Sequence, residues 1–346
     1  MYPPPHCPDC DVGLSSPLSR RQFVRTVGAA ASAASLTPAL YADQPGAKTK
    51  QPESLVKTLY DSLSTEQRAS VCFEWDHLRD GAPLRSLVQA NWHITDELLG
   101  GDFFKSDQKE LIEAIFFGLY QPDWKDRIKK QQQDDAGGFG TDQSIAIFGK
   151  PGSGKFEFVM TSRHLTIRCD GDSNDHVAFG GPIFYGHAAS SFTEAADHPG
   201  NVFWFQAQLA NKLYEMLDGR QRKLALVREA PRESNVHFRR EGEAFPGIRV
   251  GDLTRDQQEH VQKVLAALIE PYRTTDRDEV ALCLKTQGGL EKCNIAFYQS
   301  GDTGEDGVWD IWRLEGPAFV WHFRGSPHVH TWVNVASDPS VKISTG

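Results

Sequence analysis

The stretch that decides the fold is Phe156-Glu-Phe-Val-Met-Thr-Ser-Arg-His-Leu-Thr-Ile-Arg-Cys169. Aromatic and β-branched residues dominate it, a composition typical of β-strands. Apolar and polar residues alternate along its second half, and the polar set is His164, Thr166 and Arg168. Because alternate residues of a strand point to opposite faces, these three side chains are predicted to share the more polar face of a sheet.

Working outward, short strand-like runs form two blocks separated by helical sequence. The first block comprises Ser144 to Phe148, Phe156 to Cys169 and Val177 to Phe184. The second comprises Asn294 to Tyr298, Val308 to Leu314, Ala318 to Phe323 and His328 to Val335. The pattern predicts an α+β chain: an antiparallel sheet or a partial barrel built from the two strand blocks, with helices packed outside.

Helical patterning dominates from Ser54 to about Lys130 and recurs over Val202–Leu217 and Leu253–Tyr272. Polar, Gly-rich sequence predicts a loop over Gln131–Asp142, and charged, Pro-containing sequence predicts an extended loop over Arg228–Gly247. Three helix starts carry the capping-box pattern, in which a short polar residue precedes a glutamine by three positions. They are Ser64/Gln67, Asp218/Gln221 and Thr254/Gln257.

The composition is that of an ordinary globular chain. Of 346 residues, 39% are apolar and 24% charged, and the formal net charge of −9 argues against a nucleic-acid partner. Four cysteines lie downstream of the Cys7-Pro-Asp-Cys10 pair, too few for a disulfide scaffold. A single bridge between Cys283 and Cys293 is left open, and the Cys7/Cys10 pair is interpreted as part of an unstructured leader.

The N-terminus carries an export pattern. Ser19-Arg-Arg-Gln-Phe-Val-Arg25 resembles the twin-arginine signal, with Arg25 in place of lysine, and an Ala-rich apolar run follows to Leu40. We expect a signal peptide with an N-terminal extension over residues 1–42, and a linker over 43–53. The folded chain is then expected to pass through the twin-arginine translocase to the periplasm or the cell exterior, and no later stretch is apolar enough for a membrane span.

A single α+β domain is expected over residues 54–338, followed by a C-terminal tail over 339–346. Within it, Gly149-Lys-Pro-Gly-Ser-Gly-Lys155 fits most of a phosphate-binding loop. The next residue is Phe156 instead of Ser or Thr, and strand-like sequence follows where a helix is required. We therefore expect no nucleotide, and interpret Pro151–Gly154 as a hairpin turn.

The histidines give the main candidate site. His328 and His330 are two positions apart in a predicted strand, so both imidazoles project from one face. If His164 lies nearby, three imidazoles and a water suit zinc, copper or iron. Further candidate ligands or supporting residues are Glu315, His322, His187 and Asp338. The alternative is that these histidines only satisfy hydrogen bonds within a sheet.

Several runs together resemble one bacterial family, the domain of unknown function 3500. They are Phe148-Gly-Lys-Pro151, Phe156 to Ile167, Gly181-Pro-Ile-Phe-Tyr-Gly186, Trp312 to Phe319 and His328 to Trp332. The resemblance covers most of residues 54–338. The family's Gly-His-His-Leu segment aligns with Ser162-Arg-His-Leu165, so Arg163 replaces the first histidine. The resemblance implies no activity, but it marks His164, His328 and His330 as the positions to test.

Three functions follow as hypotheses. The first is a metal-dependent extracytoplasmic hydrolase or oxidoreductase, in which Arg163 or Arg313 binds an anionic substrate group and Glu315 acts as base. The second is a non-catalytic domain that binds a small ligand or a saccharide through stacking tryptophans, with Trp309, Trp312, Trp321 and Trp332 as candidates. The third is a structural secreted domain without a metal.

Overall fold

The computed structural model describes residues 51–171, 173–190, 192–194, 198–302 and 308–345, within a compact unit spanning Lys50–Gly346. The predicted signal peptide, the Cys7/Cys10 pair and nearly all of the predicted linker lie outside the described residues. The first described helix begins at Pro52, two residues inside the predicted linker. At the other end, a short strand occupies Ser344–Thr345 within the predicted tail.

The longer elements follow the two predicted blocks. The helices are α2 (Pro52–Ser62), α3 (Thr65–Val71), α4 (Ser106–Gly118), α5 (Lys125–Ala136), α6 (Trp204–Met216), α7 (Gly219–Ala225), α8 (Arg255–Ile269) and α9 (Thr274–Thr286). The main strands are β5 (Ser144–Gly149), β6 (Phe156–Ser162), β7 (Leu165–Cys169), β8 (Ile183–His187), β11 (Asn294–Tyr298), β12 (Ile311–Gly316), β13 (Phe319–Arg324) and β14 (Val329–Val335).

Short strands and 3-10 turns complete the chain. The strands are β1 (Cys72–Phe73), β2 (Leu78–Arg79), β3 (Ala82–Pro83), β4 (Leu87–Val88), β9 (Leu226–Val227), β10 (Ile248–Arg249) and β15 (Ser344–Thr345). The 3-10 turns are η1 (Pro122–Trp124), η2 (Ala178–Gly180), η3 (Val250–Asp252) and η4 (Leu290–Lys292). Of these, β1, β9 and β10 extend the main sheet from segments outside both predicted blocks.

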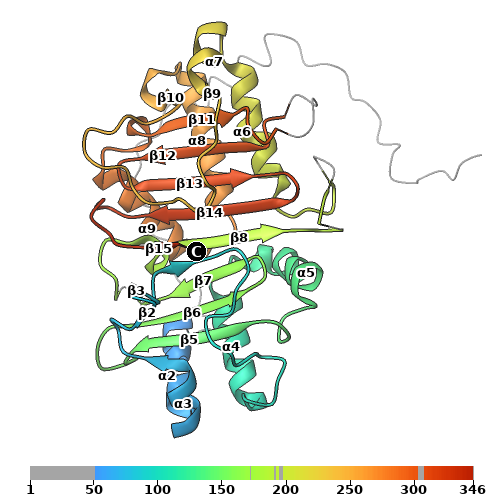
Figure 1. The fold of residues 1–346 in the computed structure, drawn as a ribbon, viewed down its shortest axis with the longest axis vertical. Helices are drawn as coiled ribbons and strands as arrows, with labels where there is room; N and C mark the ends of the chain where they lie inside the picture. Colours follow the sequence, from blue (N-terminus) through green and yellow to red (C-terminus); the bar gives the residue numbers. More distant parts are fainter. Residues whose placement is uncertain (1–50, 172, 191, 195–197, 303–307, 346) are drawn as a thin grey trace, which may run out of the picture. The chain divides into compact units, whose positions relative to one another are not determined.

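One large sheet joins the two blocks. Its order is β1-β5-β6-β7-β8-β14-β13-β12-β11-β10, with β9 also on β11, and the blocks meet where β8 pairs antiparallel with β14. Figure 1 shows the strands from β5 to β11 stacked in this order. Among the described pairs of this sheet, only β1–β5 and β9–β11 are parallel. The predicted antiparallel sheet is therefore confirmed for the main strands, and the sheet does not close into a barrel.

The two faces of the sheet are covered differently. Helices pack on one face over a continuous apolar core, to which β14 contributes Val329, Val333 and Val335. Irregular segments cover the other face, and two smaller apolar clusters join them to the sheet through Trp92 and Val236. The loop predicted over residues 228–247 is one of these covers. Polar side chains such as His330 and His322 project towards this loop-covered face.

Three local expectations have clear outcomes. The phosphate-loop look-alike is a turn between the antiparallel strands β5 and β6, closed by the Lys150 N–H donating to the Lys155 carbonyl at 3.0 Å. The loop predicted at Gln131–Asp142 is wrong in its first half, because α5 continues to Ala136. Cys283 and Cys293 are both free thiols, so the bridge left open between them is not formed.

The two halves of the chain repeat one arrangement. In each half, a capping-box glutamine exchanges hydrogen bonds with a second glutamine at the start of a later helix: Gln67 with Gln108, and Gln221 with Gln257. Gln108 also donates to the Ser62 carbonyl, as Gln257 does to that of Met216. Each half then supplies four main antiparallel strands and one short parallel strand, and the second half adds the short antiparallel strand β10.

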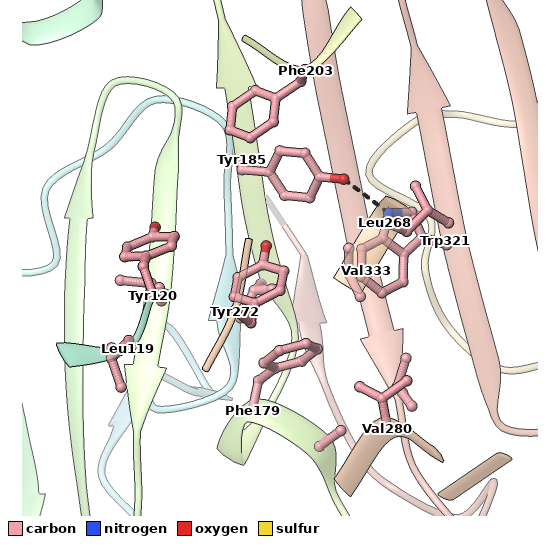
Figure 2. Close-up of a cluster of buried hydrophobic side chains, with 14 of the residues drawn as sticks. Leu119, Tyr120, Phe179, Tyr185, Phe203, Leu268, Tyr272, Val280, Trp321 and Val333 are labelled. Atoms are coloured by element: carbon pink, nitrogen blue, oxygen red, sulfur yellow. Dashed lines mark hydrogen bonds between the residues drawn. The ribbon is translucent and has the colours of Figure 1, made fainter. Parts of the chain in front are cut away.

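The halves meet through reciprocal contacts. The Gln121 N–H donates to the Pro271 carbonyl at 2.9 Å, and the Arg273 N–H donates to the Leu119 carbonyl at 3.0 Å. Between them, Tyr120 and Tyr272 stack at 5.9 Å. Figure 2 shows this pair beside the buried side chains that pack against the β8–β14 junction. Among them, Trp321 Nε1 donates to the Tyr185 hydroxyl. This arrangement is that of an approximate two-fold repeat, with its axis at the junction.

Candidate metal centre

Three histidines converge beside the junction of the two halves. His330 lies in β14 and His328 directly precedes this strand, so both imidazoles leave the same face, as the sequence predicted. His164 comes from the other half, and its position differs from the prediction. It lies in the two-residue turn between β6 and β7 with φ +59°, instead of within a strand. A left-handed backbone is rare for a residue other than glycine, and such strain is typical of functional positions.

Local contacts fix His164 in this turn. Its N–H donates to the Ala90 carbonyl at 2.8 Å, and its own carbonyl accepts from Gly186 N–H at 3.2 Å. A Cβ atom on Gly186 would lie 3.2 Å from Cγ of His164 and 2.6 Å from the Val329 carbonyl oxygen. Glycine at position 186 therefore leaves the space in which the imidazole sits.

The three Nε2 atoms form a nearly equilateral triangle. The distance from His328 is 3.1 Å to His164 and 3.1 Å to His330, and the third side measures 3.2 Å. Nitrogen atoms that share one zinc ion at about 2.0–2.1 Å and tetrahedral angles lie about 3.3–3.4 Å apart. These three side chains form a buried group that can hold a metal ion.

Each imidazole is oriented through its other nitrogen. Nδ1 of His164 lies 2.8 Å from Oδ1 of Asp135, Nδ1 of His328 lies 2.6 Å from the Phe192 carbonyl, and Nδ1 of His330 lies 3.3 Å from Oε1 of Glu233. Carbonyl and carboxylate oxygens only accept, so each Nδ1 carries the proton and each Nε2 presents a lone pair. Three lone pairs facing one another repel unless a cation lies between them.

Burial favours the uncharged form of two of the three imidazoles. It lowers the pKa of His330 to about 3, against the opposing effect of Glu233. Burial also lowers the pKa of His328, partly offset by the Phe192 carbonyl. Burial by itself raises the pKa of Glu233, but the His330 hydrogen bond and the Arg324 charge outweigh it and hold this pKa below its usual value. Neutral His328 and His330 therefore lie beside an ionised carboxylate.

Asp135 is a buried supporting residue that the sequence did not indicate. Its Oδ1 accepts from the Ala188 N–H at 3.0 Å, and its Oδ2 accepts from Gln131 at 3.2 Å. The Gln132 side-chain amide donates a hydrogen bond to the Gln131 side-chain oxygen, and the Gln143 amide donates one to Gln132. α5 lies beside the ends of β7 and β8 (Figure 1), which brings this amide chain to His164. If this segment had been assigned to a helix, the i, i+4 spacing of Gln131 and Asp135 would have indicated that the two side chains lie on the same helix face.

A pocket of about 420 Å³ adjoins the triad. Glu233, which contacts His330, and Ala90, which contacts His164, both line it. Trp332 contributes another wall, because it follows His330 by two positions on the same face. The remaining lining residues are Gln89, Asn91, Arg232 and Ser234. This pocket offers space for a small polar molecule beside residues that contact His164 and His330.

Of the other predicted site residues, Arg163 adjoins the triad in sequence, and the rest have partners outside it. Glu315 is on β12 and pairs with Arg239, with Oε1 3.0 Å from Nε. His322 accepts a hydrogen bond from Arg313 at 3.2 Å. Both ring nitrogens of His187 are hydrogen-bonded, one to Asp134 and the other to the Val202 N–H. Asp338 is exposed and accepts from the Ser340 N–H. Arg163 is half-buried beside His164, and the catalytic roles of Arg163 and Glu315 stay predictions.

The four tryptophans proposed for sugar stacking do not form a common surface. Trp312 and Trp321 are fully buried in the core, and Trp309 packs against the same core. Trp332 lines the pocket beside the triad, and it is 3% exposed. A stacking platform requires an exposed ring face, so Trp312 and Trp321 have no open face to offer a saccharide.

An open mixed sheet that brings three imidazoles together in a buried triangle defines a candidate three-histidine metalloprotein. The chain belongs to the family described as Protein of unknown function (DUF3500), which it matches over residues 45–337. This match confirms the resemblance drawn from the sequence. No curated protein and no solved structure matches the chain. Among the described residues, no helix is long and apolar enough to cross a membrane.

Proposed function

We propose that the protein binds one transition metal ion through Nε2 of His164, His328 and His330. The observation that carries the proposal is the triangle of Nε2 atoms, 3.1–3.2 Å on each side, with every Nδ1 facing an oxygen. An outer oxygen that orients a ligating imidazole is the usual support of a metal site. Imidazole ligands suit zinc, copper, iron and nickel.

The chemistry that we propose is that of a metal-dependent enzyme. Three neutral ligands leave the full charge of a divalent ion uncompensated, and such an ion acidifies a bound water or polarises a substrate oxygen. The histidines would hold the ion, Asp135 and Glu233 would orient two of them, and the adjoining pocket would admit the substrate. Zinc would favour hydrolysis, whereas copper or iron would favour an oxidoreductase.

Elemental analysis of untagged protein tests the metal proposal. We expect close to one equivalent of a single transition metal in the wild type, and at least a tenfold lower content in His164→Ala, His328→Ala and His330→Ala. His93→Ala is the matched control, because this exposed histidine contacts Asp142 away from the triad and should keep the metal. A folded wild-type protein that takes up no zinc, copper or iron, even when reconstituted, would rule the proposal out.

We also propose that the protein is exported in the folded state by the twin-arginine translocase to the periplasm or beyond. Support comes from the sequence Ser19 to Arg25 and the apolar run after it. Metal loading in the cytoplasm is compatible with a translocase that carries folded cargo. Replacing both Arg20 and Arg21 with lysine should retain the precursor in the cytoplasm. Unchanged release of the double variant would argue against this route.

A further inference from the structure

The repeat provides an internal comparison of two arginine–glutamate clusters on the loop-covered face. Arg85 and Arg239 are the same number of residues apart as the capping glutamines Gln67 and Gln221. Each arginine pairs with a glutamate on the second main strand of its half. Nη1 of Arg85 lies 2.6 Å from Oε2 of Glu157, and Nε of Arg239 lies 3.0 Å from Oε1 of Glu315.

In the first half, the cluster is closed. A second arginine, Arg168 on β7, is 2% exposed and uses all three of its guanidinium nitrogens. Nη1 donates to Glu157 at 2.9 Å and to the Arg85 carbonyl, Nη2 donates to the Leu87 carbonyl at 2.7 Å, and Nε donates to the Pro182 carbonyl at 2.7 Å. Arg168 has no donor nitrogen left without a partner, so this cluster is structural.

In the second half, the cluster is open. Its second arginine, Arg313 on β12, is also 2% exposed, and it lines a pocket of about 170 Å³. Nε donates to His322 at 3.2 Å and Nη2 donates to the Asn235 carbonyl at 2.9 Å. Nη1 lies 3.9 Å from Oε1 of Glu315, which is beyond hydrogen-bonding distance. Among the described residues, Nη1 of Arg313 therefore has no hydrogen-bond acceptor, and its side chain lies in the wall of a cavity.

The charge of the pocket favours an anion. Arg239 already holds Glu315 through two contacts, Nε to Oε1 at 3.0 Å and Nη2 to Oε2 at 3.1 Å. The lining contains three arginines against two glutamates. Asn235, His237 and Arg240 add further donors at the rim. The volume suits a single oxyanion group, since pockets for drug-sized ligands occupy about 300–1,000 Å³.

We propose that this pocket binds an oxyanion, namely the carboxylate or phosphate group of a small molecule, through Nη1 of Arg313 with Arg240 at the rim. Nη1 would donate a charge-assisted hydrogen bond to the anion, which supplies the acceptor that the neighbouring residues do not. The planar guanidinium group matches both carboxylate and phosphate geometry. This site is separate from the proposed metal centre and does not depend on it.

Calorimetric titration of the full mature chain with inorganic phosphate, and separately with acetate, tests the proposal at constant ionic strength set with chloride. We expect saturable binding of at least one probe. Arg313→Gln should weaken it at least about tenfold, the loss expected for one charge-assisted hydrogen bond. The two probes distinguish a phosphate group from a carboxylate as the preferred ligand.

A pair of exposed arginines on one loop provides a second test if Arg313→Gln does not fold. Arg240 lines the pocket and Arg228 does not. We expect Arg240→Gln to weaken binding several-fold and Arg228→Gln to leave it unchanged. The proposal is overturned if neither probe binds at millimolar concentration, if folded Arg313→Gln binds as the wild type does, or if the Arg240 and Arg228 variants behave alike.

Discussion

At the scale of single residues, the position of each imidazole depends on one oxygen behind it. Of the three residues whose oxygens face the imidazoles, Asp135 is the most constrained. Its side chain is fully buried and also accepts hydrogen bonds from Ala188 and Gln131. Outer carboxylates of this kind fix the tautomer and ring orientation of a ligating histidine. The metal affinity should therefore depend on a residue that never touches the metal.

Asp135→Asn should lower the metal affinity by about 10- to 100-fold while keeping the stoichiometry at saturation. Asparagine has nearly the same shape, but it replaces an anionic acceptor by a neutral amide. Competition with a chromogenic chelator measures the change. Asp134→Asn is the neighbouring control, since Asp134 contacts His187 and Lys130 outside the triad. Equal affinities for Asp135→Asn and the wild type would show that Asp135 does not orient His164.

A second residue-scale prediction concerns pH. Asp276 lies in the first turn of α9 and shares the Arg273 guanidinium group with Glu53. Burial, opposed by Arg273, raises the pKa of Asp276 to about 6 from a model-peptide value of 3.8. Between these two values the folded state binds more protons than the unfolded state, so stability falls as pH rises from about 4 to 6 and stays lower above.

Asp276→Asn should flatten this part of the stability curve and gain on the order of 2 kcal/mol in unfolding free energy at pH 7, with little gain at pH 4. Urea unfolding across this pH range measures both. Asp278→Asn provides a control in the same helix, because Asp278 is exposed and lies outside the Glu53–Arg273 group. An unchanged pH profile in the Asp276 variant would place the titration elsewhere.

Sequence reasoning found the three histidines of the candidate site but not the residues that support them. His328 and His330 were predictable because the two-residue period of a strand depends only on local geometry. Asp135 was not, since its segment was interpreted as a loop and its contact with His164 joins a helix to a distant turn. Glu233 and the Phe192 carbonyl lie in irregular segments, whose positions depend on tertiary packing.

At the scale of elements, the reciprocal glutamine pairs connect helices that are far apart in sequence. Gln67 and Gln108 each complete the start of one helix and donate an amide to the other. Gln108 is fully buried. Removing it should expose the start of α4, leave the Gln67 amide without its partner, and release the Ser62 carbonyl at the end of α2.

Gln108→Ala should therefore cost about 2–4 kcal/mol of unfolding free energy, more than the roughly 1 kcal/mol of an ordinary helix cap. Thermal and urea unfolding measure the loss. Gln133→Ala, on the exposed side of α5, should cost less than about 0.5 kcal/mol. The double variant Gln67→Ala/Gln108→Ala should lose less than the two single losses added together, because the pair acts as a unit. Additive losses would contradict this coupling.

Capping signals also explain which helix starts were predictable. The starts of α3, α7 and α8 were predictable because each has a short polar side chain that accepts a hydrogen bond from a backbone N–H. α9 was not predicted, and it begins after Arg273 without a side-chain cap. The two-residue strands β1, β9 and β10 are too short to leave a periodic pattern. They form because their neighbours in the sheet offer unpaired backbone groups.

At the scale of the whole molecule, the proposed metal centre joins the two halves of the repeat. His164 and Asp135 belong to the first half, whereas His328, His330 and Glu233 belong to the second. The halves also share the β8–β14 pairing and the stacked Tyr120 and Tyr272. A metal ion bound there would stabilise the association of the halves, since a ligand stabilises the state that binds it.

Two fragments, residues 45–199 and 200–346, should therefore form a one-to-one complex when co-expressed, because the divided chain keeps the whole β8–β14 interface. Zinc should strengthen the complex, whereas neither fragment alone should bind zinc tightly, since no fragment holds all three imidazoles. His328→Ala in the second fragment should abolish the zinc effect and leave metal-free association unchanged. Analytical ultracentrifugation with and without a chelator measures each case. If the fragments associate equally well with and without zinc, the result would support the two-fold repeat. The same result would contradict the proposal that a metal ion stabilises the association of the halves.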